Sequence, residues 1–188
     1  MNKKIVEQIR KFVEDECKKP GANYGMTAYN HHFISMHNYS KELAEKLHAD
    51  VELVEVAAWL HDIGSIMRGR KDHHITGSRI AENKLKELNY PQDKIELIKR
   101  CILNHRGSTE EKNNRKSVEE KIITEADCLC TFDDLAKHFW VVYSAEKKSL
   151  EEGKKSVKQK MMNKWNQLSP EGKKLIKPKY EAIMLLLN

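Results

Sequence analysis

The sequence predicts an all-α fold, and three observations support this prediction. Apolar residues recur at spacings of three and four along almost the whole chain, which is the period of an amphipathic helix. We find no convincing segment that alternates between apolar and polar residues as a half-buried strand does. No heptad repeat persists, so we expect an irregular or orthogonal bundle of about eight or nine helices rather than a long coiled coil.

The limits of the expected helices follow from local signals. We expect helices over about 3–18, 28–48, 51–63, 75–89, 91–105, 117–130, 132–151, 154–167 and from 169 to the end. Asp50 is placed to cap the third of these helices, and Gly64 to end it. Pro91 opens the fifth. The stretches 64–74 and 106–117 are expected to be loops that flank the candidate site described below.

Size and patterning indicate a soluble protein. A chain of 188 residues can bury a substantial core without disulfides, and it contains no Gly/Ser-rich or Pro-rich linker. The N-terminal stretch is charged and lacks the apolar core of a signal peptide, and the longest apolar run, "IMLLL" at 183–187, is too short to cross a bilayer. We therefore expect a cytoplasmic protein whose four cysteines stay reduced.

The charge is basic but dispersed. The net charge is +6 and the pI is near 9.0. However, the lysines form scattered pairs such as Lys3-Lys4 and Lys154-Lys155, with no arginine and aromatic interleaving beside them. We expect solvated helix faces and no specific binding of nucleic acid, together with a mild preference for small anionic molecules.

Four expected helices each direct a histidine or an aspartate inward along an apolar stripe. Residues at i, i+3, i+4 and i+7 share one helix face. By this spacing His61 continues the stripe of Val54, and His105 that of Ile98. Asp127 shares a face with Ile123, Ala126 and Cys130, whereas His32 leads to Met36, Tyr39 and Leu43. The next residue after His61 is a second acid, Asp62.

A shared metal ion explains this pattern economically. One inward histidine is ordinarily a neutral imidazole that donates to a carbonyl, but a buried carboxylate without a partner costs several kcal/mol or more. Neutral imidazoles together with carboxylates are ligands that Mn, Fe, Ni, Co or Zn accept. We therefore expect the four helices to converge on bound metal.

These residues resemble the HD-domain superfamily of metal-dependent phosphohydrolases. The resemblance lies in His32, in His61-Asp62 of "AAWLHDIG" and in Asp127 of "TEADCLC". It implies one HD-type domain over 1–188, with a metal-binding core at about 25–135, the N-terminal helix at 3–18 and a C-terminal extension at about 150–188. It also implies that His32, His61, Asp62 and Asp127 bind one divalent metal ion.

Two further motifs resemble a dinuclear subtype of this family. "HHITGS" is similar to its "HxxxGA" element, and "CILNHRG" to its "IxxH" element, which implies a second ion bound by Asp62, His105 and a histidine of the first motif. Family spacing selects His73, four residues before Gly77, whereas the apolar stripe through Gly77 and Ala81 selects His74. We prefer His73, because a residue that precedes a helix need not follow its periodicity, and keep His74 as the alternative.

The resemblance implies hydrolysis of a phosphomonoester, phosphodiester or phosphoanhydride by metal-activated water that Asp62 helps to orient, with a nucleotide as the expected class of substrate. Arg106, Arg68, Arg70 and Arg79 are candidates to bind the phosphate. Ser65 stands where many relatives have lysine, and the "HDxxED" and "HDIGHPPFGH" signatures are absent. This makes guanosine-tetraphosphate hydrolysis and deoxynucleotide triphosphohydrolysis poor matches.

Two other functions stay open at this point. Some members of the superfamily use a similar ligand set to hold two irons and activate dioxygen, and a degenerate domain would bind a nucleotide as a sensor without turnover. The ligand set is compatible with the first, and the second would be marked by lost ligands. The stretch "YEAIMLLL" is a candidate surface for a homodimer.

Overall fold

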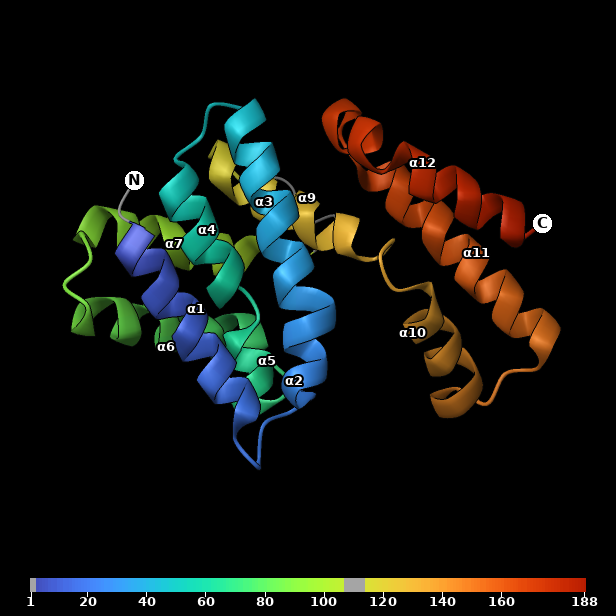
Figure 1. Ribbon diagram of the computed structural model, residues 1–188, viewed down its shortest axis with the longest axis horizontal. Helices are drawn as coiled ribbons and strands as arrows, with labels where there is room; N and C mark the ends of the chain where they lie inside the picture. Colours follow the sequence, from blue (N-terminus) through green and yellow to red (C-terminus); the bar gives the residue numbers. More distant parts are fainter. Residues whose placement is uncertain (1–2, 107–113) are drawn as a thin grey trace. The chain divides into compact units, whose positions relative to one another are not determined.

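The computed structural model describes residues 3–106 and 114–188, and the described part of the chain is helical without strands, which confirms the predicted all-α class (Figure 1). The elements in chain order are α1 (Lys3–Lys18), α2 (Gly25–Ala28), the π-helical turn η1 (Tyr29–Phe33), α3 (Ile34–Lys46), α4 (Val51–Leu60), α5 (Ile63–Arg68), α6 (His73–Glu87), α7 (Gln92–Asn104), α9 (Val118–Cys130), α10 (Leu135–Trp140), a second π-helical turn η2 (Val141–Ala145), α11 (Leu150–Gln167) and α12 (Pro170–Leu186).

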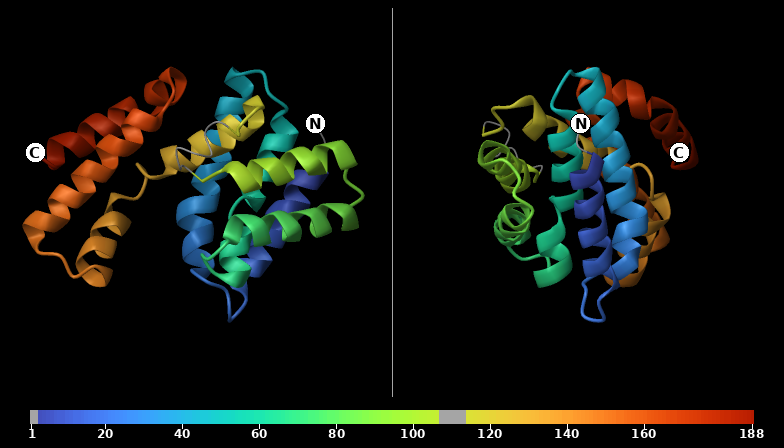
Figure 2. Two further views of the ribbon diagram at one scale, coloured as in Figure 1. Left: turned by 180° about the vertical axis from the view of Figure 1, so that it is seen from behind. Right: turned by 60° about the vertical axis from the view of Figure 1, so that its left-hand side comes forward.

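The chain divides into two compact units, Met1–Ala126 and Asp127–Asn188, and the division falls inside α9. Helix α4 lies at the centre of the first unit. Every residue from Leu53 to Leu60 is buried, as expected of a helix that is covered on all sides. Helices α1, α3 and α7 pack against α4, and Figure 2 shows α1 and α3 beside it. Asp50 caps α4 as predicted, since its side chain accepts a hydrogen bond from the amide of Leu53 at 3.1 Å.

Helices α5, α6 and α7 form the other side of the first unit. Helix α5 covers the first residues of the stretch 64–74, which was predicted to be a loop, so the prediction was wrong for these residues. Two glycines let α5 and α6 approach closely, because the nitrogen of Gly64 lies 3.2 Å from the Cβ position of Gly77. A Cβ atom on Gly64 would lie 2.1 Å from the carbonyl oxygen of His73. Only glycine fits at this position.

The second unit begins with the end of α9 and continues through α10, η2, α11 and α12. A single helix over 132–151 was predicted here, and this was wrong, since α11 begins separately at Leu150. The cause is a capping box, in which Ser149 and Glu152 each bind the backbone amide of the other. The rings of Trp165 and Tyr180 stack at 4.2 Å and join α11 to α12.

Two other features of the described residues bear on the sequence predictions. None of the described helices combines the length and apolarity that crossing a bilayer requires. All four cysteines are buried thiols, and burial raises the pKa of Cys101 well above its ordinary range. The predicted loop over 106–117 includes residues 107–113, which lie outside the described residues.

Candidate metal centre

His61 and Asp62 form the junction between two helices. His61 follows the last residue of α4 and is fully buried, and Asp62 precedes α5. The carbonyl of Asp62 accepts hydrogen bonds from the amides of Ser65 at 2.9 Å and Ile66 at 3.3 Å. Because the chain turns here, the two neighbouring side chains can face one common centre instead of diverging around a single helix.

His32 reaches this centre from a π-helical turn. The turn η1 follows α2 and leads directly into α3, so the predicted helix over 28–48 is interrupted by one wide turn. Such turns frequently occur at functional sites. The Nε2 atom of His32 lies 2.9 Å from Nε2 of His61. The sequence spacing predicted that His32 points inward, but it did not predict the π-helical turn.

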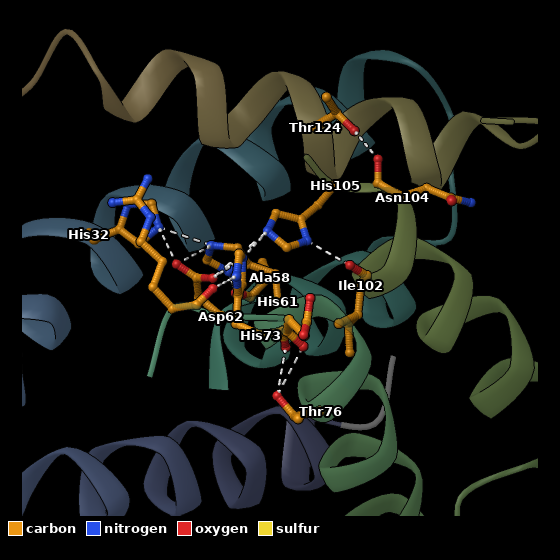
Figure 3. Close-up of polar contacts among 12 residues, drawn as sticks. His32, Ala58, His61, Asp62, His73, Thr76, Ile102, Asn104, His105 and Thr124 are labelled. Carbon is orange, nitrogen blue, oxygen red and sulfur yellow. Dashed lines mark hydrogen bonds and ion pairs between the residues drawn. The ribbon is translucent and has the colours of Figure 1, made fainter. Parts of the chain in front are cut away.

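Asp62 lies between two pairs of imidazoles, as Figure 3 shows. Its Oδ2 atom lies 3.8 Å from Nε2 of His32 and 3.9 Å from Nε2 of His61. Its Oδ1 atom lies 3.2 Å from Nε2 of His73 and 3.7 Å from Nε2 of His105. One carboxylate therefore presents one oxygen to each pair.

Three of these rings are held by the same local contact. The Nδ1 atom of His61 lies 2.8 Å from the carbonyl of Ala58, that of His73 2.9 Å from the carbonyl of Arg70, and that of His105 2.6 Å from the carbonyl of Ile102. In each case the acceptor is the carbonyl three residues earlier. A carbonyl can only accept, so Nδ1 carries the proton and Nε2 of the neutral ring carries the lone pair. A metal-binding imidazole is ordinarily oriented in this way.

The donor atoms of the second pair fit a cation. The Nε2 atoms of His73 and His105 are 3.3 Å apart, although both are acceptors in the neutral rings. The Oδ1 atom of Asp62, which faces them, is buried and accepts no hydrogen bond. Ligand atoms of Asp62, His73 and His105 all lie within 4.8 Å of one another. A divalent ion would use all three lone pairs, so these residues suit a metal.

A second group of ligand atoms consists of His32, His61 and Asp127, which also lie within 4.8 Å of one another. Asp127 stands on α9, nine residues after its first residue, and Ala126 beside it is completely buried. The two groups together contain two carboxylates and four imidazoles. Their composition suits transition ions that accept nitrogen and oxygen ligands.

The electrostatics of the centre favour an ionised Asp62. Burial alone would raise the pKa of this carboxyl, but the positive charge that His61, His105, His32 and His73 carry when protonated outweighs that effect and lowers the pKa to about 2. The side chain of Asp62 is still 27% exposed, so the centre is open to solvent on one side. Asp62 is therefore negatively charged at neutral pH and in contact with solvent.

The model of the HD domain family matches residues 29–131. The match spans more than half of the chain and includes His32, His61, Asp62, His73, His105 and Asp127. The protein belongs to the HD domain family.

Other similarities are more distant. An uncharacterized protein of Clostridium beijerinckii is 28% identical over 156 residues, which cover 76% of this HD-domain chain and 88% of that protein. Two crystal structures of the HD domain of the L. monocytogenes phosphodiesterase PgpH are 19% identical, one of them in complex with cyclic-di-AMP. The match with the complex covers 95% of this chain and 95% of that chain, with a TM-score of 0.46. The match with the other structure covers 98% of each chain, with a TM-score of 0.43.

The remaining predicted site residues of this HD domain are not members of the two ligand groups. His73 belongs to a ligand group, but the neighbouring His74 belongs to neither group. Both residues lie in α6, where successive side chains point in directions about 100° apart around the helix axis. Arg68, Arg70, Arg79 and Arg106 are all exposed. Their role in binding phosphate stays a prediction.

Some polar residues of the HD domain were missed at the sequence level. Glu55 is buried in α4, and its Oε1 atom lies 2.8 Å from Nε2 of His37. Glu120 and Arg115 are buried next to the end of α7 that carries His105. Glu120 could have been recognised, because Ser117 and Glu120 form the S-x-x-E pattern of a capping box. Arg115 has no comparable signal in the sequence.

Proposed function

We propose that this protein is a metal-dependent phosphohydrolase that cleaves a phosphoester or phosphoanhydride bond of a small phosphorylated molecule, with a nucleotide as the expected class of substrate. The observation that supports this most directly is the position of Asp62, with one carboxylate oxygen turned to each pair of imidazoles. A carboxylate in this position suits two ions rather than one. Membership of the HD domain family supports the same chemistry.

The ligands of the proposed ions follow from the two groups. We propose that His32, His61, Asp62 and Asp127 hold one divalent ion and that Asp62, His73 and His105 hold the other. Mn, Fe, Ni, Co and Zn are the candidates. When bound, a pair of such ions lowers the pKa of water and offsets the charge that develops on the phosphoryl oxygens.

The residues of the chain would contribute orientation and charge. The carbonyl contacts of His61, His73 and His105 fix the direction in which each ring offers its lone pair. Asp62 stays ionised, because its pKa is about 2, and can accept a hydrogen bond from the attacking water. In this proposal a phosphate group would approach from the side on which Asp62 is exposed to solvent.

We extend the proposal to substrate binding and cellular context. Arg68 and Arg106 are exposed cations in the stretches 64–74 and 106–117, and Arg79 is an exposed cation on α6. These three arginines would bind further oxygens of a phosphorylated substrate. We propose that the protein acts in the cytoplasm, without specific binding of nucleic acid. A homodimer formed through the C-terminal stretch "YEAIMLLL" is also part of this proposal.

The test is metal reconstitution followed by an activity screen. Metal-free protein is loaded separately with Mn, Ni, Co, Zn or, under anaerobic conditions, Fe, and is assayed against an aryl phosphate, an aryl phosphodiester and a panel of nucleotides. We expect hydrolysis with at least one ion, and its loss in Asp62→Asn and Asp127→Ala with the helical content unchanged. Full activity in either variant would contradict the assignment. Substrate-dependent oxygen uptake with iron, without hydrolysis under any metal, would replace the hydrolase by an oxygenase.

A further inference from the structure

The end of helix α7, which carries His105, is held by residues of the following segment. The last carbonyls of a helix have no partner within the helix. Here the carbonyl of Asn104 accepts hydrogen bonds from Nε of Arg115 at 2.8 Å and from Oγ1 of Thr124 at 3.4 Å, the latter drawn in Figure 3. The carbonyl of Arg106 accepts another hydrogen bond from Nη2 of Arg115. Arg115 thus donates hydrogen bonds to the backbone carbonyls immediately before and immediately after His105.

Glu120 holds the same helix end by a different route. Its side chain is 0% exposed. Its Oε2 atom accepts from the amides of Ser117 at 3.0 Å and Lys116 at 3.2 Å, and its own amide binds Oγ of Ser117 at 3.2 Å. This is the reciprocal pattern of a capping box at the start of α9. The other oxygen, Oε1, accepts from Nδ2 of Asn104 at 2.8 Å.

The second contact of Glu120 goes beyond capping. A capping box needs only one carboxylate oxygen, and the other oxygen is ordinarily left to solvent. Burying it against Asn104 has a desolvation cost, which the hydrogen bond from the amide offsets. Arg115 is similar, because its buried guanidinium is directed at two backbone carbonyls rather than at water. Arg115 therefore contacts both neighbours of His105, and Glu120 contacts one of them, Asn104.

The position of His105 is correspondingly constrained. The contact of Nδ1 with Ile102 sets the rotation of the ring, but it leaves the backbone of His105 to be fixed by its neighbours. Nε2 of His105 lies 3.3 Å from Nε2 of His73 and 3.7 Å from Oδ1 of Asp62. A small shift of the backbone would open this group, because His105 directly follows the last residue of α7 and moves with the end of that helix.

We propose that Arg115 and Glu120 are positioning residues that hold His105 in place for the ion bound by Asp62, His73 and His105. This inference rests on the proposed two-metal site and adds to it a dependence on residues that do not touch the metal. The affinity for that ion would depend on both residues, whereas the affinity for the ion at His32, His61 and Asp127 would not.

The experiment is a metal titration of metal-free protein, with Mn²⁺ or Co²⁺ alone as the probe. The variants are Glu120→Gln and Arg115→Lys. In Glu120→Gln an NH₂ group replaces one carboxylate oxygen and faces a hydrogen-bond donor, whereas the lysine of Arg115→Lys cannot reach both carbonyls. His105→Ala serves as the reference that identifies the affected binding step. Glu119→Gln is the matched control, because Glu119 contacts the amide of Asp50 instead of α7.

We expect two binding steps in the wild-type protein and a loss of affinity of about 10- to 100-fold in one of them for Glu120→Gln and Arg115→Lys. It should be the step that His105→Ala removes, and Glu119→Gln should bind as the wild type does. Co²⁺ absorption reports on the coordination of each ion, which a purely structural role would leave unchanged.

Three results would overturn this inference. They are a single binding step in the wild-type protein, equal weakening of both steps in the variants, and wild-type affinity in Glu120→Gln together with Arg115→Lys. Circular dichroism of the metal-free variants tests whether they are folded. If one variant is unfolded, the titration of the other variant decides the question. The titration is independent of turnover. Two bound ions without hydrolysis of any phosphate ester would therefore refute the proposed function while the titration still decides the role of Arg115 and Glu120.

Discussion

At the scale of single residues, three histidine rings are oriented by one repeated contact. His61, His73 and His105 each donate from Nδ1 to the carbonyl three residues earlier. The donor and the acceptor belong to the same turn of chain, so each ring brings its own orientation with it. The three rings need no partner from another helix to point their Nε2 atoms in the required direction.

The choice between His73 and His74 leads to a direct prediction. His73→Ala should lose one of the two proposed ions, because its Nε2 atom is in the group with Asp62 and His105. His74→Ala should keep both ions, because its ring is not in either group. The measurement is the metal content of each variant after loading with Mn²⁺ and removal of unbound ions. A loss of metal in His74→Ala that matches the loss in His73→Ala would contradict the prediction.

The sequence could identify part of the centre at this scale. Apolar stripes indicated that His61 and His105 point inward, and both are indeed buried. The stripe argument alone selected His74, because periodicity assumes that a residue lies well inside its helix. His73 is the first residue of α6, preceded by Asp72 in the left-handed region at a φ of 51°. The periodicity of apolar residues does not predict such a left-handed residue before a helix.

At the scale of elements, the contact between α5 and α6 determines where His73 lies. A Cβ atom on Gly64 would lie 2.1 Å from the carbonyl oxygen of His73 and 2.6 Å from the nitrogen of Gly77. Both atoms belong to the backbone, so no side chain can move aside. Gly64 is therefore necessary for two reasons, because it allows the helices to pack and it brings His73 close to Asp62.

We predict that Gly64→Ala lowers the free energy of unfolding by roughly 1–3 kcal/mol or more, as overpacking of a close contact does. Gly21→Ala is the matched control, because no atom lies within 4 Å of the Cβ position of Gly21. It should change stability by no more than about 0.5 kcal/mol. Denaturant unfolding followed by circular dichroism measures both. Equal stability of the two variants would show that α5 and α6 can separate at little cost.

Most elements were predictable, and the errors share a cause. The sequence period located α1, α4, α7 and α9 closely, because each has one strong apolar face or a clear cap. Helix α5 was missed, since Gly64 was taken as a stop although here it is a packing position. A separate helix over about 154–167 was expected, but its start was placed four residues too late, because the capping box at Ser149 interrupts a stretch that is otherwise helical in pattern.

At the scale of the whole molecule, the buried helix α4 carries the first part of the candidate centre on its last turn. Leu53 to Leu60 are all buried, and the chain reaches His61 and Asp62 directly afterwards. A packed helix of this kind gives the centre a rigid base. Bound metal should stabilise the folded chain in return, because the ligand groups are assembled only in the folded state.

We predict that divalent metal raises the stability of the protein by linkage. At a free concentration of 100 times the dissociation constant, one ion that binds only the folded state adds about 2.7 kcal/mol to the free energy of unfolding. A chelator should lower the thermal midpoint, and Asp62→Asn should abolish the difference. Thermal unfolding with and without Mn²⁺ measures this. Identical midpoints for the wild-type protein under both conditions would contradict metal binding in the folded state.

The sequence predicted the class of the whole molecule but not its division. All-α architecture followed from periodicity alone, and the HD motifs indicated the family to which the chain belongs. The change of unit between Ala126 and Asp127 has no sequence signal, because it falls inside the continuous helix α9. The arrangement as one HD-type domain, with a core at about 25–135 and extensions at 3–18 and about 150–188, stays a prediction.

The π-helical turn over Tyr29–Phe33 has a consequence for how this chain tolerates changes in length. A π-helical turn contains one residue more than an α-helical turn, so the register of α3 is offset from that of α2. Deleting a single residue there would let the two segments merge into one regular helix with little disturbance of the backbone. His32 would then be carried about a quarter of a turn around the axis, away from its neighbours. The protein would keep its helices and lose one proposed metal ligand.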